Sequence, residues 1–114
     1  MKILVAEDGR IVAKLLSGLL VERGHQVEVY STLAELRERL IGPPPDRCLL
    51  DLVLANGEVA EVIDDLRRAW PHTPFAIWTA SSPQHHPRIE GVKVLQKPCT
   101  LDEILAVLDE VPNG

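Results

Sequence analysis

The sequence lacks the features of several broad classes of protein. It has only two cysteines, Cys48 and Cys99, which are too few for a disulfide framework and favour a reducing compartment. It has no apolar run near the length of about 20 residues that crosses a bilayer. Its first residues are strand-like and show no signal-peptide pattern. We therefore expect a cytoplasmic protein with no membrane partner.

Positive charge is also scarce. The 12 Lys and Arg residues are outnumbered by 17 Asp and Glu residues, which gives a net charge of -5. An acidic surface repels a phosphate backbone, so we expect no nucleic-acid binding by this domain. The four histidines are scattered, and the adjacent pair His85 and His86 cannot share one face of a helix. This distribution argues against a zinc site.

What the chain does contain is a regular alternation of strand-like and helix-like segments within one domain, residues 1–114. Short apolar runs predict strands that are buried on both faces, and apolar residues at helical spacing predict helices between them. This alternation predicts an α/β fold with a mostly parallel sheet and helices on both faces. The five expected strands are residues 2–6, 26–30, 48–51, 75–79 and 92–96.

The expected helices carry signals of their own. Thr32 with Glu35, and Thr100 with Glu103, have the spacing of a capping box. The first helix is expected to end at Gly24. Its predicted buried face comprises Ile11, Val12, Leu15, Leu16, Leu19 and Leu20. The third helix is predicted from the stripe Val59, Val62, Ile63 and Leu66.

The segment of residues 80–91 differs from the other connections. It contains Pro83 and Pro87 and has almost no apolar face. A proline inside a helix costs about 3 kcal/mol. We therefore expect the fourth helix to be short or missing.

Polar residues of distinct kinds end four of the five expected strands. Glu7 and Asp8 end the first, Asp51 the third, Thr79 the fourth and Lys97 the fifth. The carboxyl ends of parallel strands meet at one edge, where open α/β sheets bind their ligands. We therefore expect these five side chains to lie near one another.

The chemistry of this set points to a metal ion and a phosphoryl group. Three carboxylates at one point repel one another unless a cation compensates their charge, and oxygen ligands suit Mg²⁺. The Lys97 ammonium and the Thr79 hydroxyl could bind phosphoryl oxygens. A carboxylate is a known nucleophile for phosphoryl transfer, so the predicted reaction is transfer onto a carboxylate.

Four segments together resemble the receiver domain of response regulators, a CheY-like family, over essentially the full chain. They are residues 3–8, 49–52, 74–80 and 94–98. The resemblance implies a flavodoxin-like doubly wound fold with strand order 2-1-3-4-5. It also implies a phosphorelay function, with a sensor histidine kinase or a histidine phosphotransfer protein as donor and a downstream protein as target.

The resemblance implies a role for each site residue. Asp51 would be the phosphoacceptor, and Asp8, Asp51 and the backbone carbonyl of Val53 would bind Mg²⁺, with Glu7 assisting through water. Thr79 and Lys97 would contact phosphoryl oxygens, and Ala80 would leave room for the group. The family's cis bond would fall at Lys97–Pro98. These roles make the chain a signalling switch rather than an enzyme.

The sequence departs from the family pattern at several positions. Val94 stands where the family's switch uses an aromatic residue, so an aromatic rotation cannot report phosphorylation. Ala55 and Val59 replace the usual proline and glycine, and residues 56–57 supply the turn instead. Cys99 replaces a common phenylalanine.

Two other functions stay open at this point. Because of Val94 and the short fourth helix, the chain could be a receiver-like interaction module that does not cycle phosphate. It could also be a Mg²⁺-dependent phosphatase, although such enzymes usually place a second acid where Val53 stands. Only four residues follow the last expected helix, so we expect output through a partner protein or through a domain beyond this sequence.

Overall fold

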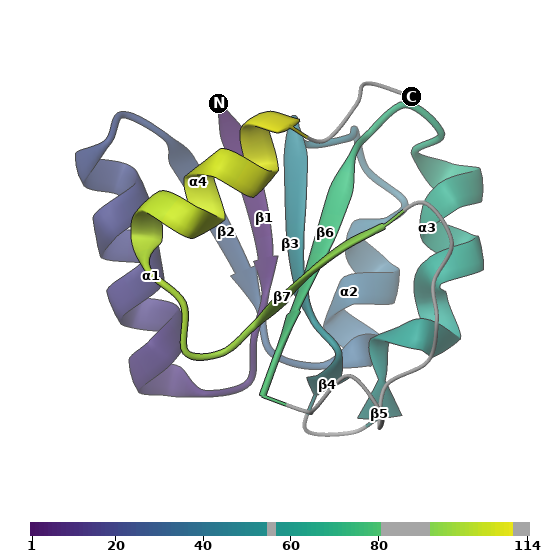
Figure 1. Ribbon diagram of the computed structural model, residues 1–114. Coiled ribbons are helices and arrows are strands. Elements are labelled where there is room, and N and C mark those ends of the chain that lie inside the picture. The colour runs from purple at the N-terminus through teal and green to yellow at the C-terminus, as the bar shows by residue number, and fades with distance from the viewer. Residues whose placement is uncertain (55–56, 81–91, 111–114) are drawn as a thin grey trace.

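A five-stranded parallel sheet forms the centre of the computed structural model, which describes residues 1–54, 57–80 and 92–110 (Figure 1). The strand order is β2-β1-β3-β6-β7, which confirms the predicted 2-1-3-4-5 order once the two short strands β4 and β5 are set aside. The five strands are β1 (Lys2–Ala6), β2 (Gln26–Tyr30), β3 (Arg47–Asp51), β6 (Phe75–Thr79) and β7 (Lys93–Gln96).

Helices cover both faces of this sheet, as predicted. Helices α1 and α4 lie on one face, and α2 and α3 lie on the other (Figure 1). Their bounds are α1 (Arg10–Glu22), α2 (Leu33–Arg39), α3 (Ile63–Ala69) and α4 (Leu101–Glu110). The helix predicted to be short or missing falls on residues 81–91, which lie outside the described residues.

Each face has its own apolar core. Between the sheet and α1 and α4, buried residues include Val5, Leu16, Leu49 and Leu108. Between the sheet and α2 and α3, they include Leu4, Leu36, Leu50, Leu66 and Ile77. Successive residues of a strand point to opposite faces, so the uninterrupted apolar runs of β1 and β3 supply both cores. Asp51 lies at the carboxyl edge of the sheet because it is the last residue of β3.

The predicted buried face of the first helix is partly wrong. Leu16 and Leu20 are buried, but Ala13 completes the buried stripe, and Ile11 and Leu15 are 77% and 63% exposed. Apolar residues extend around much of α1, so helical periodicity alone does not select the face. The short link through Gly9 fixes the direction in which α1 leaves β1 and so decides which side meets the sheet.

The local helix signals are mostly confirmed. The Glu35 backbone N–H donates to Thr32 Oγ1 at 3.1 Å, and the Glu103 N–H donates to Thr100 Oγ1 at 3.1 Å. The third helix begins with a 3₁₀ turn, Val59–Val62, before α3. This turn follows a hairpin of β4 (Val53–Leu54) and β5 (Gly57–Glu58).

Gly57 makes this hairpin possible. Its φ of +152° suits glycine, and a Cβ there would lie 2.6 Å from Leu33 Cδ1. The predicted turn at residues 56–57 includes residue 56, which lies outside the described residues.

Candidate functional site: the carboxyl edge of the sheet

Three carboxylates meet at the carboxyl edge of β1 and β3. Glu7 and Asp8 directly follow β1, and Asp51 is the last residue of β3. The register that pairs Ala6 with Leu50 brings these strand ends side by side. Each of the three residues offers a carboxylate oxygen, and these oxygens lie within 4.8 Å of one another. The fold therefore gathers three acids from two distant parts of the chain at one point.

Lys97 reaches the same point from the end of β7. Its Nζ lies 2.6 Å from Glu7 Oε1 and 3.0 Å from Asp51 Oδ2. The Lys97 backbone N–H donates to the Thr79 carbonyl at 2.7 Å, which ties the residue to β6. The Lys97–Pro98 peptide bond is cis, as the resemblance implied. Glu7, Asp8, Asp51 and Lys97 are called the acidic cluster below.

Burial makes the electrostatics of the acidic cluster unusual. Glu7 and Asp51 are only 3% and 8% exposed, whereas Asp8 faces solvent. Burial raises the pKa of Glu7, and the neighbouring Asp51 carboxyl raises it further, while Lys97 acts in the opposite direction. Burial lowers the pKa of Lys97, but its bonds to Glu7 and Asp51 outweigh this effect, so the pKa is raised. One ammonium therefore does not fully offset the negative charge.

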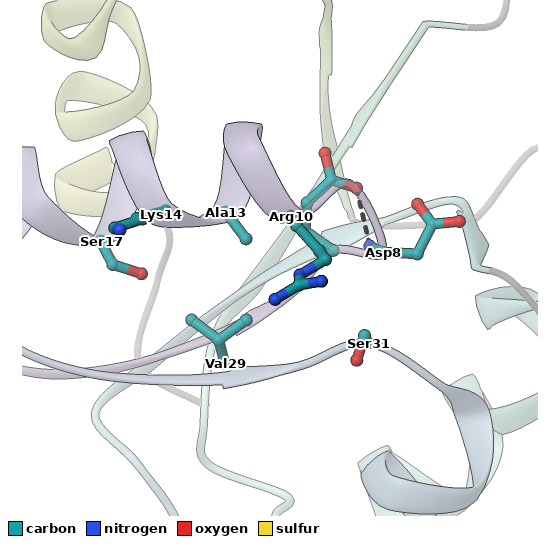
Figure 2. Close-up of a pocket in the computed structure, with 8 residues that line it drawn as sticks. Asp8, Arg10, Ala13, Lys14, Ser17, Val29 and Ser31 are labelled. Atoms are coloured by element: carbon teal, nitrogen blue, oxygen red, sulfur yellow. Dashed lines mark hydrogen bonds between the residues drawn. The ribbon is translucent and has the colours of Figure 1, made fainter.

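The backbone next to the cluster supports the carboxylates. The Asp8 N–H donates to Glu7 Oε2 at 3.0 Å (Figure 2). The Val53 N–H donates to Asp51 Oδ1 at 3.3 Å, while the Val53 side chain is 46% exposed. These bonds orient the carboxylates without neutralising them.

Thr79 is the last residue of β6 and Ala80 follows it, and β6 lies between β3 and β7 in the sheet. Thr79 is 1% exposed and pairs with Gln96, one position before Lys97. Ala80, in contrast, is exposed. Glu7, Asp8 and Asp51 thus lie at the same edge of the sheet as Thr79, Ala80 and Lys97, and the roles assigned to these residues stay predictions.

Sequence reasoning missed how Lys97 is held. It expected Lys97 to meet a phosphoryl oxygen, and it did not anticipate the ion pair with Glu7. Lys97 Nζ also lies 4.3 Å from the centre of the Trp78 ring. No local pattern indicated this contact, because the register that pairs Trp78 with Asp51 is set by the folded sheet.

A groove of about 370 Å³ adjoins the acidic cluster. Figure 2 shows it running along α1, with the Arg10 guanidinium between that helix and Val29 of β2. The groove opens at Glu7 and Asp8, so it borders the site rather than containing it. Its lining residues are Glu7, Asp8, Arg10, Ala13, Lys14, Ser17, Val29 and Ser31.

This arrangement has a definite chemical capacity. The carboxylate oxygens of Glu7, Asp8 and Asp51, of which Asp8 faces solvent, fit a hard divalent cation. The charge of that cation would offset the excess of negative charge. Lys97 would remain beside Asp51 to contact an anionic group bound there. The described residues thus place three carboxylates that could hold a cation beside a positive side chain.

Comparison with known proteins identifies the family. Residues 3–109 match the response regulator receiver domain family, so the chain belongs to it and is a receiver domain of the kind found in two-component response regulators. Transcriptional regulatory protein DltR of Streptococcus agalactiae is 29% identical over 93% of this chain and 49% of that protein. Acid tolerance regulatory protein ActR of Rhizobium meliloti is 25% identical over 97% of this chain and 59% of that protein. The chain spans about half the length of these relatives, which are named as regulatory proteins rather than enzymes.

Solved receiver structures share the fold. The non-phosphorylated HemR receiver domain of Leptospira biflexa has a TM-score of 0.81 at 25% identity, over 95% of this chain and 90% of that chain. A receiver protein of Sinorhizobium medicae has a TM-score of 0.86 at 20% identity, over 96% and 92%. A Burkholderia pseudomallei response regulator with a phosphorylated aspartic acid and a calcium ion has a TM-score of 0.81 at 23% identity, over 94% and 65%. Among the described residues, no helix of this chain is long and apolar enough to span a membrane.

Proposed function

We propose that this receiver domain accepts a phosphoryl group on Asp51 from a phosphohistidine donor in a Mg²⁺-dependent step. The observation that carries the proposal is the position of Lys97 Nζ, 3.0 Å from Asp51 Oδ2, beside carboxylate oxygens that lie within 4.8 Å of one another. The proposed acceptor thus lies beside a positive side chain and near carboxylates that could hold the ion. The donor would be a sensor histidine kinase or a histidine phosphotransfer protein.

In the proposed reaction, an Asp51 carboxylate oxygen forms a bond to phosphorus while the bond between phosphorus and the donor imidazole nitrogen breaks. The imidazole leaves with the electron pair of that bond. Asp8, Asp51 and the Val53 carbonyl would hold Mg²⁺, with Glu7 assisting, and the ion would neutralise charge on the phosphoryl oxygens. Hydrolysis of the acyl phosphate would return the domain to its starting state.

The remaining site residues stabilise the transferred group in this proposal. Lys97 would exchange its bond to Asp51 for one to a phosphoryl oxygen, and the Thr79 hydroxyl would donate to another. Ala80, at an exposed position, would leave the space that the group needs. The catalytic contribution is positioning and charge neutralisation, which is why we describe the domain as a switch.

The output would pass through a protein partner in the cytoplasm. The transcriptional regulatory protein DltR, to which this chain is similar, is about twice as long, so the partner could be a domain of a longer protein. Val94 occupies the family's aromatic switch position and is 42% exposed. We propose that this domain signals without an aromatic rotation.

The direct test is phosphorylation with a small donor. Incubation with phosphoramidate and Mg²⁺ should add one phosphoryl group by intact-mass spectrometry. Asp51→Asn, or excess EDTA, should prevent the gain. Asp64→Asn is the matched control, because it removes an exposed carboxylate of α3 far from the cluster.

This experiment, together with an assay on a phosphomonoester, separates the alternative functions. A wild-type protein that gains no mass would favour an interaction module that does not cycle phosphate, which Val94 makes the main alternative. Repeated turnover of a phosphomonoester would instead indicate a phosphatase.

A further inference from the structure

We propose that Trp78 is a positioning residue for phosphoryl transfer, because its ring holds the Lys97 ammonium beside Asp51 while the hydrogen-bond partners of that ammonium change. This inference rests on the proposed function. It concerns a side chain that is given no role in the proposed function above.

The geometry of the contact supports this role. Lys97 Nζ lies 4.3 Å from the centre of the Trp78 ring, well within the range of about 6 Å for a cation–π interaction. The ring is fixed, because Trp78 is 5% exposed and belongs to the core shared with Leu16 and Ile104. The Lys97 side chain is 20% exposed, so its attraction to the ring is only partly screened by solvent.

The contact suits a group that must change partners. A lysine ammonium has three N–H donors, and two of them are engaged by Glu7 and Asp51. A phosphoryl group on Asp51 would compete for these donors. A ring face attracts the ammonium without fixing the direction of any N–H, so it can retain Lys97 in the site as bonds to the carboxylates are exchanged.

The chain offers clean variants for a test. The Trp78 indole N–H is buried and has no hydrogen-bond partner among the described residues. Trp78→Phe therefore keeps an aromatic face without losing a hydrogen bond, whereas Trp78→Leu removes the face. Trp70 is a control outside the site, because Arg39 lies 5.1 Å from its ring in a cluster that does not involve Lys97. Its substitution also removes a hydrogen bond from the indole N–H to the Gly42 carbonyl, so only the phosphorylation rate is compared.

The test is a double-mutant cycle on the rate of phosphorylation by phosphoramidate. We expect Trp78→Leu to lower the rate about tenfold, and Trp78→Phe to lower it by no more than about threefold. In a Lys97→Met background, Trp78→Leu should produce no further loss. Trp70→Phe should leave the rate unchanged, and Leu66→Ala, in the core on the opposite face of the sheet, should reduce stability with little effect on the rate. A full tenfold loss that persists without Lys97, or a Trp78→Leu protein as fast as the wild type, would overturn the inference.

A second measurement does not depend on phosphorylation. The Lys97 ε-methylene protons should show upfield NMR shifts from the Trp78 ring, which Trp78→Phe retains in part and Trp78→Leu abolishes. Normal shifts in the wild type would overturn the inference even if phosphorylation occurs. A wild type that shows the shifts but gains no phosphoryl group would contradict the proposed function and the catalytic part of this inference, while leaving the contact itself established.

Discussion

Two clusters in this protein combine the same kinds of side chain and have opposite electrostatic character. In the acidic cluster, Lys97 lies over Trp78 and bonds to Glu7 and Asp51. In a second cluster, Arg39 of α2 lies over Trp70 and donates to both carboxylate oxygens of Glu28 in β2. Each cluster thus has a cation between a carboxylate and a tryptophan ring.

The clusters differ in the ratio of negative to positive groups. In the acidic cluster, Glu7 and Asp51 share the Lys97 ammonium and Asp8 adds a third carboxylate beside them. Glu28, in contrast, pairs with Arg39 and Lys2 and accepts a hydrogen bond from Tyr30. The Arg39 bond lowers the pKa of Glu28, while burial and Asp51 raise the pKa of Glu7. The comparison teaches that the excess of carboxylate, rather than the motif of cation and ring, marks the functional site. We call the group of Glu28, Tyr30, Arg39 and Trp70 the Glu28 cluster.

The largest expected effect on stability comes from breaking the Glu28 cluster. Arg39→Ala should lower the free energy of unfolding at pH 7 by about 3 kcal/mol, because it leaves Glu28 partly buried without its partner. Urea denaturation would measure the change. Arg37→Ala, at an exposed position of the same helix, should change stability by less than about 0.5 kcal/mol. Phosphorylation of folded Arg39→Ala should match the wild type, and a strong loss of phosphorylation would show that the two clusters are coupled.

A smaller effect distinguishes the clusters through metal binding. Because Mg²⁺ would bind the folded acidic cluster, a concentration ten times its Kd should stabilise the wild type by about 1.4 kcal/mol. Thermal unfolding with and without Mg²⁺ would measure this gain. Asp8→Asn should remove most of it, whereas Glu28→Gln should retain it. Equal stabilisation of wild type and Asp8→Asn would place the metal elsewhere.

The five strands and the meeting of the acids at one edge could be predicted from patterns of the chain, whereas the order of the strands came from the resemblance to receiver domains. Apolar runs define the strands, and parallel strands bring their carboxyl ends together, so Glu7, Asp51 and Lys97 are neighbours although they are far apart in sequence. The helix caps at Thr32 and Thr100 could also be predicted, from the spacing of each threonine and the glutamate three residues later.

What could not be predicted depends on side-chain direction and on charge balance in three dimensions. Nothing local to α1 shows that Ala13 rather than Leu15 faces the sheet, because apolar residues surround much of that helix. The pairing of Arg39 with Glu28 joins two elements whose separation in space the sequence does not give. The contact between Lys97 and Trp78 depends on the path of the chain after β7.

The smallest expected effect comes from two substitutions that each neutralise one carboxylate, measured without divalent cations. They sharpen the comparison most, because they should change the free energy of unfolding in opposite directions. Glu28→Gln should lower the free energy of unfolding at pH 7 by about 1 kcal/mol, the difference between a charged and a neutral hydrogen bond. Glu7→Gln should raise it by up to about 1 kcal/mol, because it removes a buried charge that only Lys97 compensates. Both are measured by urea denaturation in EDTA.

The two stability differences from the wild type should also change over different ranges of pH. The reason is that the pKa of Glu7 is raised above 4.5, whereas the pKa of Glu28 is lowered below it. Ionised Glu7 costs stability, so the advantage of Glu7→Gln should shrink as the pH falls towards 4.5 and the wild type becomes protonated there. Glu28 stabilises the fold while ionised, so the deficit of Glu28→Gln should persist at pH 4.5 and shrink only at lower pH. If both differences instead shrank over the same range of pH, the two carboxylates would have similar environments, and the excess of carboxylate would no longer distinguish the site from the Glu28 cluster.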